Sequence, residues 1–275
     1  MIDLHTHSTA SDGVLSPTEL IEKAASEGLS AIALTDHDSL DGLDEASRAA
    51  LRLGLRFVPG IEIEIVFGPG EFHLLGLDFG AIDTKLVAAA RELADSRDSR
   101  NRAVFDNLKE LGLDVPYDDF KAEIGGGMVG RPHIADLMVR KRLARSKQDA
   151  FNRYLAKGRS MYIQKACLPL DEAMDVIKGS GGLAVVAHPL SLFVSWSRMR
   201  LLMGEWKERG VDGIEAWHPT ARVVDCERLE AMAREFGLRV TGGSDYHGPN
   251  RPERRLGRSA GARPIDDRYL AALDR

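Results

Sequence analysis

Residues 1–13 read MIDLHTHSTASDG, a short apolar run followed by two histidines and an aspartate. The apolar start predicts a β-strand over residues 1–5, with His5 at its end and His7 two positions later. Residues i and i+2 of an extended chain point to the same side, so both imidazoles can face one ion. Imidazoles combined with carboxylates suit Zn²⁺, Mn²⁺ or Fe²⁺, whereas Mg²⁺ prefers oxygen ligands alone. An isolated His-x-His pair in an exposed loop would look the same, so the rest of the chain has to distinguish the two.

Six further short apolar, β-branched runs follow, and amphipathic stretches that predict helices separate most of them. Ser16, followed by Pro17 and Glu19, predicts a capped helix N-terminus, and Gly28 and Gly54 mark helix ends. Strands that alternate with helices predict an α/β fold with a mostly parallel sheet. The seven predicted strands are 1–5, 31–35, 56–67, 71–79, 183–188, 213–217 and 238–244.

One stretch, residues 85–160, breaks this alternation and predicts three or four helices without a strand. It contains 16 Lys and Arg against 11 Asp and Glu, whereas the remaining residues contain 21 against 31. The excess concentrates in 131–159, with nine basic and two acidic residues. We therefore predict a discontinuous barrel (1–84 and 161–275) with a helical insertion (85–160) that handles anions. For any single cation, ordinary surface solvation is the alternative.

The composition is that of an ordinary globular protein, with 275 residues, 44% hydrophobic and 29% charged. No apolar run approaches the length of a membrane span, and the N-terminus lacks the pattern of a signal peptide. A cytoplasmic location and no membrane partner are therefore expected. Cys167 and Cys226 lie in no CxxC pattern and are expected to be two buried, reduced thiols.

The residues that can carry chemistry fall mostly at the ends of the predicted strands. Active sites of β/α barrels are built at the carboxyl ends of their strands, so these side chains are expected to converge there. The eighth histidine, His133, lies in the insertion. The barrel residues are His5 and His7 (first strand), His37 (second), Glu62 (third), His73 (fourth), His188 (fifth), His218 (sixth), and Asp245 and His247 (seventh).

The chain resembles the PHP family, the polymerase and histidinol phosphatase metal-dependent phosphoesterases. The matching stretches are DLHTHSTASDG, ALTDHDSLDG, GIEI, HLLGL, AHP and GGSDYHGP. It is most similar to a stand-alone bacterial branch with a helical insertion, whose members act as nucleoside 3′,5′-bisphosphate phosphatases and 5′-3′ exoribonucleases. The resemblance spans nearly the whole chain and is loosest in the insertion, at RPHIA, YLAKG and Tyr162. It implies a distorted, TIM-like (β/α)7 barrel.

The resemblance also implies a trinuclear site that holds two or three divalent ions. Mn²⁺ is the expected metal, with Fe²⁺ or Zn²⁺ as alternatives. Glu62 would bridge the first two ions. The implied ligands are His5, His7, Glu62 and Asp245 for the first ion, Glu62, His73 and His133 for the second, and Asp12, His37 and His247 for the third.

The remaining candidates concern the phosphate. His188 is expected to act at the phosphate or to support the ligands, with a structural hydrogen bond as the alternative. Arg131 is a candidate both for catalysis and for substrate binding, and Lys157 for holding a phosphate that is not cleaved. His218 is a candidate substrate contact, with a surface role as its alternative. Asp36 is a candidate for fixing the tautomer of an imidazole.

These residues predict an enzyme, a divalent-metal-dependent phosphoesterase that uses metal-activated water. The expected reaction removes the 3′-phosphate of nucleoside 3′,5′-bisphosphates, and short 5′-phosphorylated RNA is a further expected substrate. Three divalent ions outweigh the charge of three carboxylate ligands, which favours an anionic substrate. The alternatives are a phosphatase for histidinol phosphate or another small phosphomonoester, an amidohydrolase-type C–N hydrolase, and a non-enzymatic metal-stabilised module. No obligate protein partner is implied.

Overall fold

The structure of the protein is a computed structural model that describes residues 1–68, 70–125, 127–249 and 251–274. Within these residues, no helix combines the length and the apolar character needed to cross a bilayer.

The chain forms two compact units. The first comprises Met1–Ala90 and Cys167–Arg275, and the second comprises Arg91–Ala166. Helix α3 (Thr84–Glu110) begins in the first unit and ends in the second. The second unit therefore overlaps the insertion expected at 85–160 but begins and ends about six residues later.

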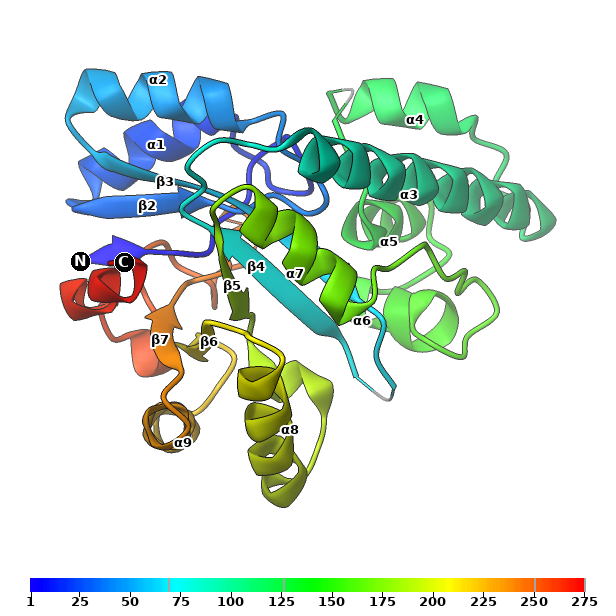
Figure 1. The fold of residues 1–275 in the computed structure, drawn as a ribbon. Coiled ribbons are helices and arrows are strands. Elements are labelled where there is room, and N and C mark those ends of the chain that lie inside the picture. Colours follow the sequence, from blue (N-terminus) through cyan, green and yellow to red (C-terminus); the bar gives the residue numbers. More distant parts are fainter. Residues whose placement is uncertain (69, 126, 250, 275) are drawn as a thin grey trace. The chain divides into compact units, whose positions relative to one another are not determined.

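The first unit is built on one seven-stranded sheet whose strands are neighbours in chain order (Figure 1). A bridge between Thr6 and Tyr246, together with a hydrogen bond from the Leu4 N–H to the Gly242 carbonyl (3.2 Å), joins the last strand to the first. The sheet is thereby nearly closed into a barrel, as the sequence predicted. The strands are β1 (Ile2–Asp3), β2 (Ala31–Leu34), β3 (Arg56–Ile65), β4 (Phe72–Leu77), β5 (Leu183–Val186), β6 (Gly213–Trp217) and β7 (Arg239–Gly242).

Strand β4 is reversed relative to the other six. It pairs antiparallel with both β3 and β5, whereas the remaining pairs are parallel. Only residues 66–71 connect β3 to β4, and a parallel crossover needs a dozen residues or more. The reversal has a consequence for His73, the second residue of β4. It puts the start of β4 at the end of the barrel where the parallel strands finish.

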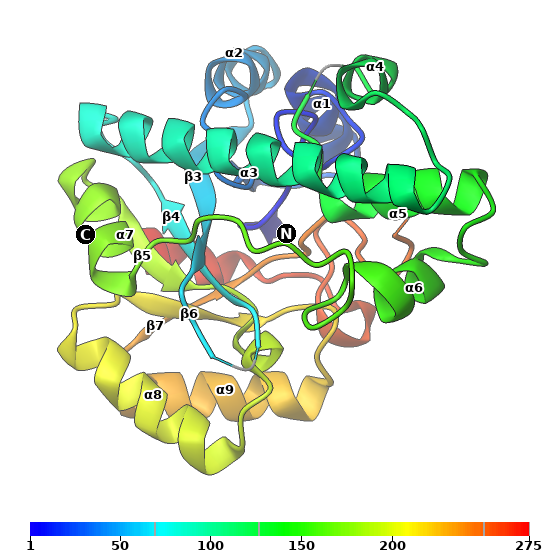
Figure 2. The same ribbon diagram turned by 90° about the vertical axis from the view of Figure 1, so that its right-hand side faces the viewer.

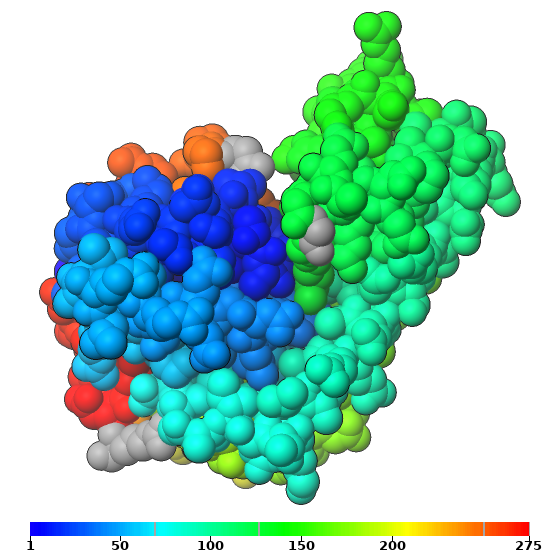
Figure 3. Space-filling view, turned by 90° about the horizontal axis from the view of Figure 1, so that it is seen from above, coloured from blue at the N-terminus to red at the C-terminus, as the bar shows by residue number. Residues whose placement is uncertain are grey.

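Helices cover the outside of the barrel. Ser16 and Glu19 form the predicted capping box of α1. Helices α1 and α2 pack against each other through apolar residues such as Ile21 and Ala46, and Figure 3 shows them side by side in blue. Near the chain ends, the Met1 ammonium group lies 2.7 Å from Asp267. The helices are α1 (Pro17–Ser26), α2 (Leu43–Leu53), α7 (Leu170–Gly179), α8 (Trp196–Glu208) and α9 (Val223–Glu235), with 3-10 turns at Pro189–Leu192, Ala260–Ala262 and Asp267–Leu273.

The described residues of the second unit form helices joined by turns and loops, without a strand, and they have their own apolar core. Besides the later part of α3, it contains α4 (Tyr117–Glu123), α5 (Arg131–Arg140) and α6 (Lys147–Ala150), which a π-helical turn extends to Leu155 (Figure 2). The core joins these helices through buried side chains that include Phe105, Leu108, Phe120, Ile134 and Met138. The predicted helical character of the insertion is therefore confirmed.

The two cysteines differ in burial. Cys226 is buried whereas Cys167 is partly exposed, so the expectation of two buried thiols is wrong for Cys167. Burial raises the pKa of Cys226 to about 11. Cys226 is therefore a neutral thiol at physiological pH, which excludes it as a thiolate ligand or nucleophile.

Candidate metal centre

Seven of the eight histidines gather at one end of the barrel. The ring centroids of His7 and His247 are 4.1 Å apart, and those of His73 and His188 are 5.1 Å apart. These residues follow parallel strands or, for His73, begin the reversed strand β4, which is why chain segments so distant in sequence meet here. The predicted convergence is thus present in the structure. The seven histidines are His5, His7, His37, His73, His188, His218 and His247.

The imidazoles of His5 and His7 lie close together and near two carboxylates. His5 Nε2 and His7 Nε2 are 3.1 Å apart, and each lies 3.3 Å from Glu62 Oε2. Asp245 Oδ1 lies 3.6 Å and 3.2 Å from the same two nitrogens. Two donors bound about 2.1 Å from one ion are about 3.0–3.5 Å apart at octahedral to tetrahedral angles. Most of these distances lie in that range, and the donor atoms of His5, His7 and Asp245 all lie within 4.8 Å of one another, so these side chains could hold one divalent ion.

Two buried carboxylate oxygens support this fit. Among the described residues, Glu62 Oε2 and Asp12 Oδ1 are buried without a hydrogen-bond partner. A buried, ionised oxygen without such a partner is costly, and coordination of a cation removes that cost. Glu62 and Asp12 both belong to groups of side chains whose donor atoms lie within 4.8 Å of one another.

Glu62 faces two sets of imidazoles with its two oxygens. Oε1 lies 2.7 Å from His73 Nδ1 and 3.0 Å from His188 Nε2, whereas Oε2 faces His5 and His7. His37 Nδ1 also lies 3.0 Å from Oε2. A carboxylate that presents one oxygen to each of two donor groups has the geometry of a bridging ligand.

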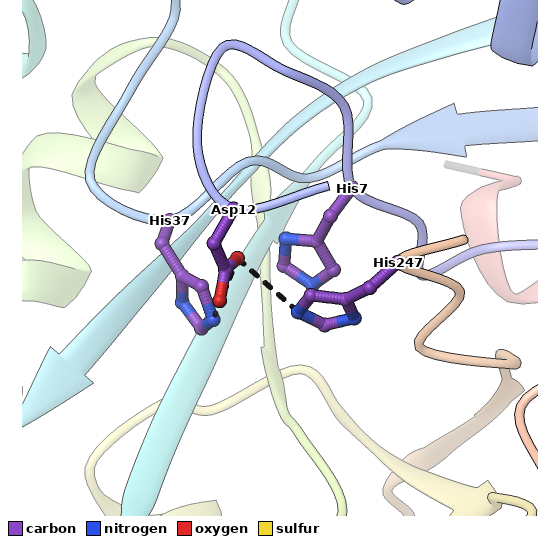
Figure 4. A group of neighbouring side chains, drawn as sticks. All are labelled: His7, Asp12, His37 and His247. Carbon is purple, nitrogen blue, oxygen red and sulfur yellow. Dashed lines mark ion pairs between the residues drawn. The ribbon is translucent and has the colours of Figure 1, made fainter. Parts of the chain in front are cut away.

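A third group surrounds Asp12 and is shown in Figure 4. Asp12 Oδ1 lies 3.2 Å from His247 Nε2 and 3.9 Å from His37 Nε2, and His7 completes the group. His37 turns its two nitrogens towards different carboxylates, Nε2 to Asp12 and Nδ1 to Glu62. The structure therefore brings together eight of the nine predicted ligands.

Electrostatics keeps the carboxylates of this centre ionised. Burial by itself raises the pKa of Glu62, but the imidazoles of His37, His5 and His73 outweigh it and hold that pKa well below its usual range. Burial likewise raises the pKa of Asp12, and neighbouring imidazoles, His37 among them, lower it well below the usual range. Both groups are therefore ionised and able to bind cations at neutral pH.

Two residues of the centre have left-handed backbone conformations. His188 has φ 26° and Asp245 has φ 51°. Non-glycine residues rarely adopt such angles, and surrounding structure has to hold them there. A hydrogen bond from the Asp245 N–H to the His5 carbonyl (2.9 Å) does so for Asp245. At the neighbouring Gly243, a Cβ would lie 2.2 Å from the His5 Cβ, so only glycine allows this approach of the strands.

The sequence analysis missed Glu215, which is buried in β6. Its Oε1 accepts a hydrogen bond from His5 Nδ1 (3.1 Å), and its Oε2 accepts one from the His188 backbone N–H (2.8 Å). When Nδ1 of His5 carries the proton, Nε2 keeps its lone pair for an ion. A carboxylate inside an otherwise apolar strand, GIEAW, was the signal that could have revealed this residue.

Asp36 has a different role from the one expected, because in the part of the chain that the structure describes its carboxylate accepts hydrogen bonds from two serines. It accepts hydrogen bonds from the Ser8 N–H (2.8 Å), the Ser8 hydroxyl (2.6 Å) and the Ser11 hydroxyl (2.5 Å). Ser11 Oγ lies 3.5 Å from His7 Nδ1. Asp36 thus holds the loop that carries His7 and Asp12, and Ser11 links it to the imidazole of His7.

Two further cations near the centre were not identified from the sequence. Arg254 forms an ion pair with Asp245 Oδ2, and an Arg251 nitrogen lies 3.9 Å from Asp12 Oδ2. Burial raises the pKa of Asp245, but Arg254 and the imidazoles of His247 and His5 hold it well below its usual range. The arginine-rich segment after the seventh strand therefore supplies positive charge to the centre.

His218 does not lie on the surface, so that alternative is wrong. Its side chain is buried, with Nδ1 2.7 Å from the Thr220 hydroxyl and Nε2 3.4 Å from Asp245 Oδ2. Burial lowers the pKa of His218, which favours the neutral imidazole. Neutral His218 helps to orient Asp245, and its predicted contact with substrate stays a prediction.

The predicted residues of the insertion lie in the second unit. His133 is in the first turn of α5, where its Nδ1 accepts a hydrogen bond from the Gly130 N–H (3.1 Å). The Arg131 guanidinium lies 5.8 Å from the centre of the Tyr162 ring, and Lys157 is exposed. The roles of His133, Arg131 and Lys157 at the metal centre stay predictions.

Removal of bound metal is expected to destabilise the protein. Without a cation, Glu62 Oε2 and Asp12 Oδ1 stay buried and ionised without a hydrogen-bond partner. A ligand at about a hundred times its dissociation constant stabilises by about 2.7 kcal/mol, so chelation should lower the melting temperature by roughly 5–10 °C. Differential scanning calorimetry before and after EDTA measures this, with recovery on Mn²⁺ addition as the control. An unchanged melting temperature after verified metal removal would contradict the proposed centre.

Comparisons with known proteins find relatives over nearly the whole chain. A 5′-3′ exoribonuclease of Haemophilus influenzae is 35% identical, with 90% of both chains covered. A 3′,5′-nucleoside bisphosphate phosphatase of Chromobacterium violaceum is 32% identical, covering 96% of this chain and 93% of the relative.

Two solved structures have the same fold. One, described as an amidohydrolase of Chromobacterium violaceum with bound sulfate and no metal, is 31% identical with a TM-score of 0.86, covering 100% of this chain and 97% of its own. The other, assigned as a metal-dependent phosphoesterase of Bifidobacterium adolescentis, is 29% identical with a TM-score of 0.85, covering 99% and 94%.

The barrel, the donor groups and these relatives define an enzyme of the metal-dependent phosphoesterase class. A model of the PHP domain matches residues 3–113. The chain belongs to the PHP domain family.

Proposed function

We propose that the enzyme removes the 3′-phosphate of nucleoside 3′,5′-bisphosphates, giving nucleoside 5′-monophosphate and phosphate, and that it also shortens 5′-phosphorylated RNA from its 5′ end. The activities in the names of the two relatives above support this choice of substrates. The observation that carries the chemistry is Glu62, whose two oxygens face separate groups of imidazoles. That arrangement suits adjacent divalent ions that act on one phosphate.

The proposed ligand sets combine the donor atoms that lie around each of the three carboxylates Glu62, Asp245 and Asp12. Glu62 bridges the first and second ions. The proposed sets are His5, His7, Glu62 and Asp245 for the first ion, Glu62, His73 and His188 for the second, and Asp12, His37 and His247 for the third, with His133 as the further ligand predicted from sequence.

Bound ions of this kind would lower the pKa of a water molecule and neutralise charge on the phosphoryl oxygens. Residues of the chain orient the ligands and place positive charge near the substrate. Asp245 directs Oδ1 to the donor group of the first ion, and Arg254 holds its other oxygen. Arg251 and Arg254 place positive charge beside the centre, where it can stabilise the anionic transition state.

The competing functions have weaker support. A C–N hydrolase of the amidohydrolase type needs neither the third group around Asp12 nor the arginines at 251 and 254, and both suit a multiply charged substrate. A phosphatase for histidinol phosphate would use the same centre, but its substrate has one phosphate and gives the basic second unit no role.

Phosphate release with Mn²⁺ tests the proposal directly. Adenosine 3′,5′-bisphosphate, histidinol phosphate and a short 5′-phosphorylated RNA are compared side by side, each with Asp245→Asn as the metal-site control. We expect preference for the bisphosphate or the RNA, and loss of activity on both in the variant. Preference for histidinol phosphate would overturn the substrate assignment, and no release from any of the three would overturn the phosphoesterase chemistry.

The two candidate histidines for the second ion give a separate test. We expect His188→Asn to lower the number of bound metal ions by one, because His188 Nε2 lies 3.0 Å from the bridging Glu62. Metal content per chain, measured by plasma mass spectrometry after gel filtration, gives the answer. His133→Asn is the matched substitution in the second unit. A full metal complement in His188→Asn would return this residue to the phosphate-contact role predicted from sequence.

A further inference from the structure

The second unit has a basic cleft at the end of α5. The cleft has a volume of about 420 Å³, and three arginines contribute half of the six residues that line it. The lining residues are Val139, Arg142, Leu143, Ala144, Arg145 and Arg153.

Positive charge in this cleft is only partly neutralised. Arg142 and Arg145 are exposed, and in the part of the chain that the structure describes neither guanidinium forms an ion pair. Arg153 lies 3.3 Å from Asp149 Oδ2 and donates a hydrogen bond to the Leu143 carbonyl (3.2 Å). The cleft is therefore lined by three arginines, and one carboxylate, that of Asp149, is paired with one of them. The remaining positive charge favours an anionic ligand.

The backbone fixes Arg142 in place. Helix α5 ends in a Schellman motif, in which the Arg142 N–H donates to the Val139 carbonyl (3.0 Å) and the Leu143 N–H to the Met138 carbonyl (2.8 Å). Arg142 adopts φ 62°, a conformation that glycine takes without steric cost and other residues do not. Glycine would form this turn with less strain, so the turn by itself does not explain an arginine at position 142.

We propose that this cleft binds backbone phosphates of single-stranded RNA downstream of the 5′ end that is being hydrolysed. The inference rests on the proposed function, because an enzyme that shortens RNA has to hold the strand beyond the cleaved bond. Guanidinium groups match phosphate oxygens with two parallel hydrogen bonds. Such contacts add affinity without sequence preference, which suits the processing of any RNA.

The turn geometry allows a variant that cannot fail by unfolding at this site. Arg142→Gly replaces the strained residue by the one that the turn favours, so its melting temperature should be equal or higher. We combine it with Arg145→Ala, which removes a second exposed charge. The control is Arg91→Ala with Lys109→Ala, which removes two exposed charges of the same unit on α3, away from the lining residues.

Binding is measured by fluorescence anisotropy of a labelled RNA of about 20 nucleotides, without added metal so that the RNA stays intact. We expect the cleft variant to bind on the order of ten-fold more weakly than wild type at moderate salt. Each lost phosphate contact should reduce the slope of log affinity against log salt concentration by about 0.7. The control variant should keep nearly the affinity and slope of wild type.

Hydrolysis of adenosine 3′,5′-bisphosphate in the same preparations separates this inference from the proposed function. We expect it to be unchanged in both variants, while the KM for the RNA rises in the cleft variant only. Wild-type affinity and salt slope in the cleft variant would overturn the inference, as would an equal loss in the control variant. If polyglutamate of matched charge displaced the labelled RNA as well as unlabelled RNA does, RNA would be overturned as the ligand. If the wild-type enzyme did not hydrolyse adenosine 3′,5′-bisphosphate, the proposed function would be overturned. The anisotropy measurements would still decide whether the cleft binds RNA.

Discussion

Glu62→Gln is expected to lower kcat for phosphate release on the order of a thousand-fold, the largest effect of any single substitution considered. Both Glu62 oxygens face imidazoles, at 2.7 Å on one side and 3.3 Å on the other, and glutamine can offer only one oxygen without charge. Two adjacent ions would lose their shared anionic ligand, and the stabilisation that metal ions give the transition state is worth several kcal/mol. Metal content should fall together with kcat.

The matched control is Glu64→Gln, the same change two residues further along β3. Residues i and i+2 of a strand share a face, so this variant tests whether any acid on that face would serve. We expect less than about a three-fold change for Glu64→Gln, as for substitutions that remove no ligand. Equal loss of activity in the two variants would refute the bridging role of Glu62.

Glu215→Gln is expected to weaken metal affinity by about 10- to 100-fold, the second-largest effect. An amide NH₂ in place of Oε1 would point a donor at the N–H of His5 Nδ1, and the imidazole would have to change tautomer or turn. In the new tautomer Nε2 carries the proton and cannot bind an ion. The same substitution also disturbs His188, because its backbone N–H donates to Glu215 Oε2.

Metal affinity is best measured by titration of the metal-free protein with Mn²⁺, in parallel with thermal unfolding of the metal-free form. The control is Glu230→Gln, also a buried glutamate with several hydrogen-bond donors around it, among them Trp217 Nε1 and the Tyr269 hydroxyl. Among the described residues, the hydrogen bonds of the Glu230 carboxylate come from tryptophan, tyrosine and arginine side chains, so its variant should lose stability and keep metal affinity. If both variants lost Mn²⁺ affinity to the same degree, Glu215 would act only by stabilising the fold.

The sequence by itself determined the seven strands, the capped helices and eight residues that now lie in donor groups. Each of these depends on local physics: alternation of side chains in HTH and SDYH, capping by Ser16, and the rule that parallel strands end at one edge of a barrel. The motif match to the PHP family rests on the same residues. Each of these features can be read from a stretch of about ten consecutive residues.

Only the tertiary structure decided how these parts meet. The reversal of β4 brings His73 to the centre from the start of its strand, and it follows from the short link between β3 and β4. Glu215 and Arg254 gain their roles from partners about 210 and 9 residues away, respectively, through contacts that no local pattern encodes. A carboxylate in a strand or an arginine in a loop has no distinctive local signal, because its role depends on what the fold places within about 3 Å of it.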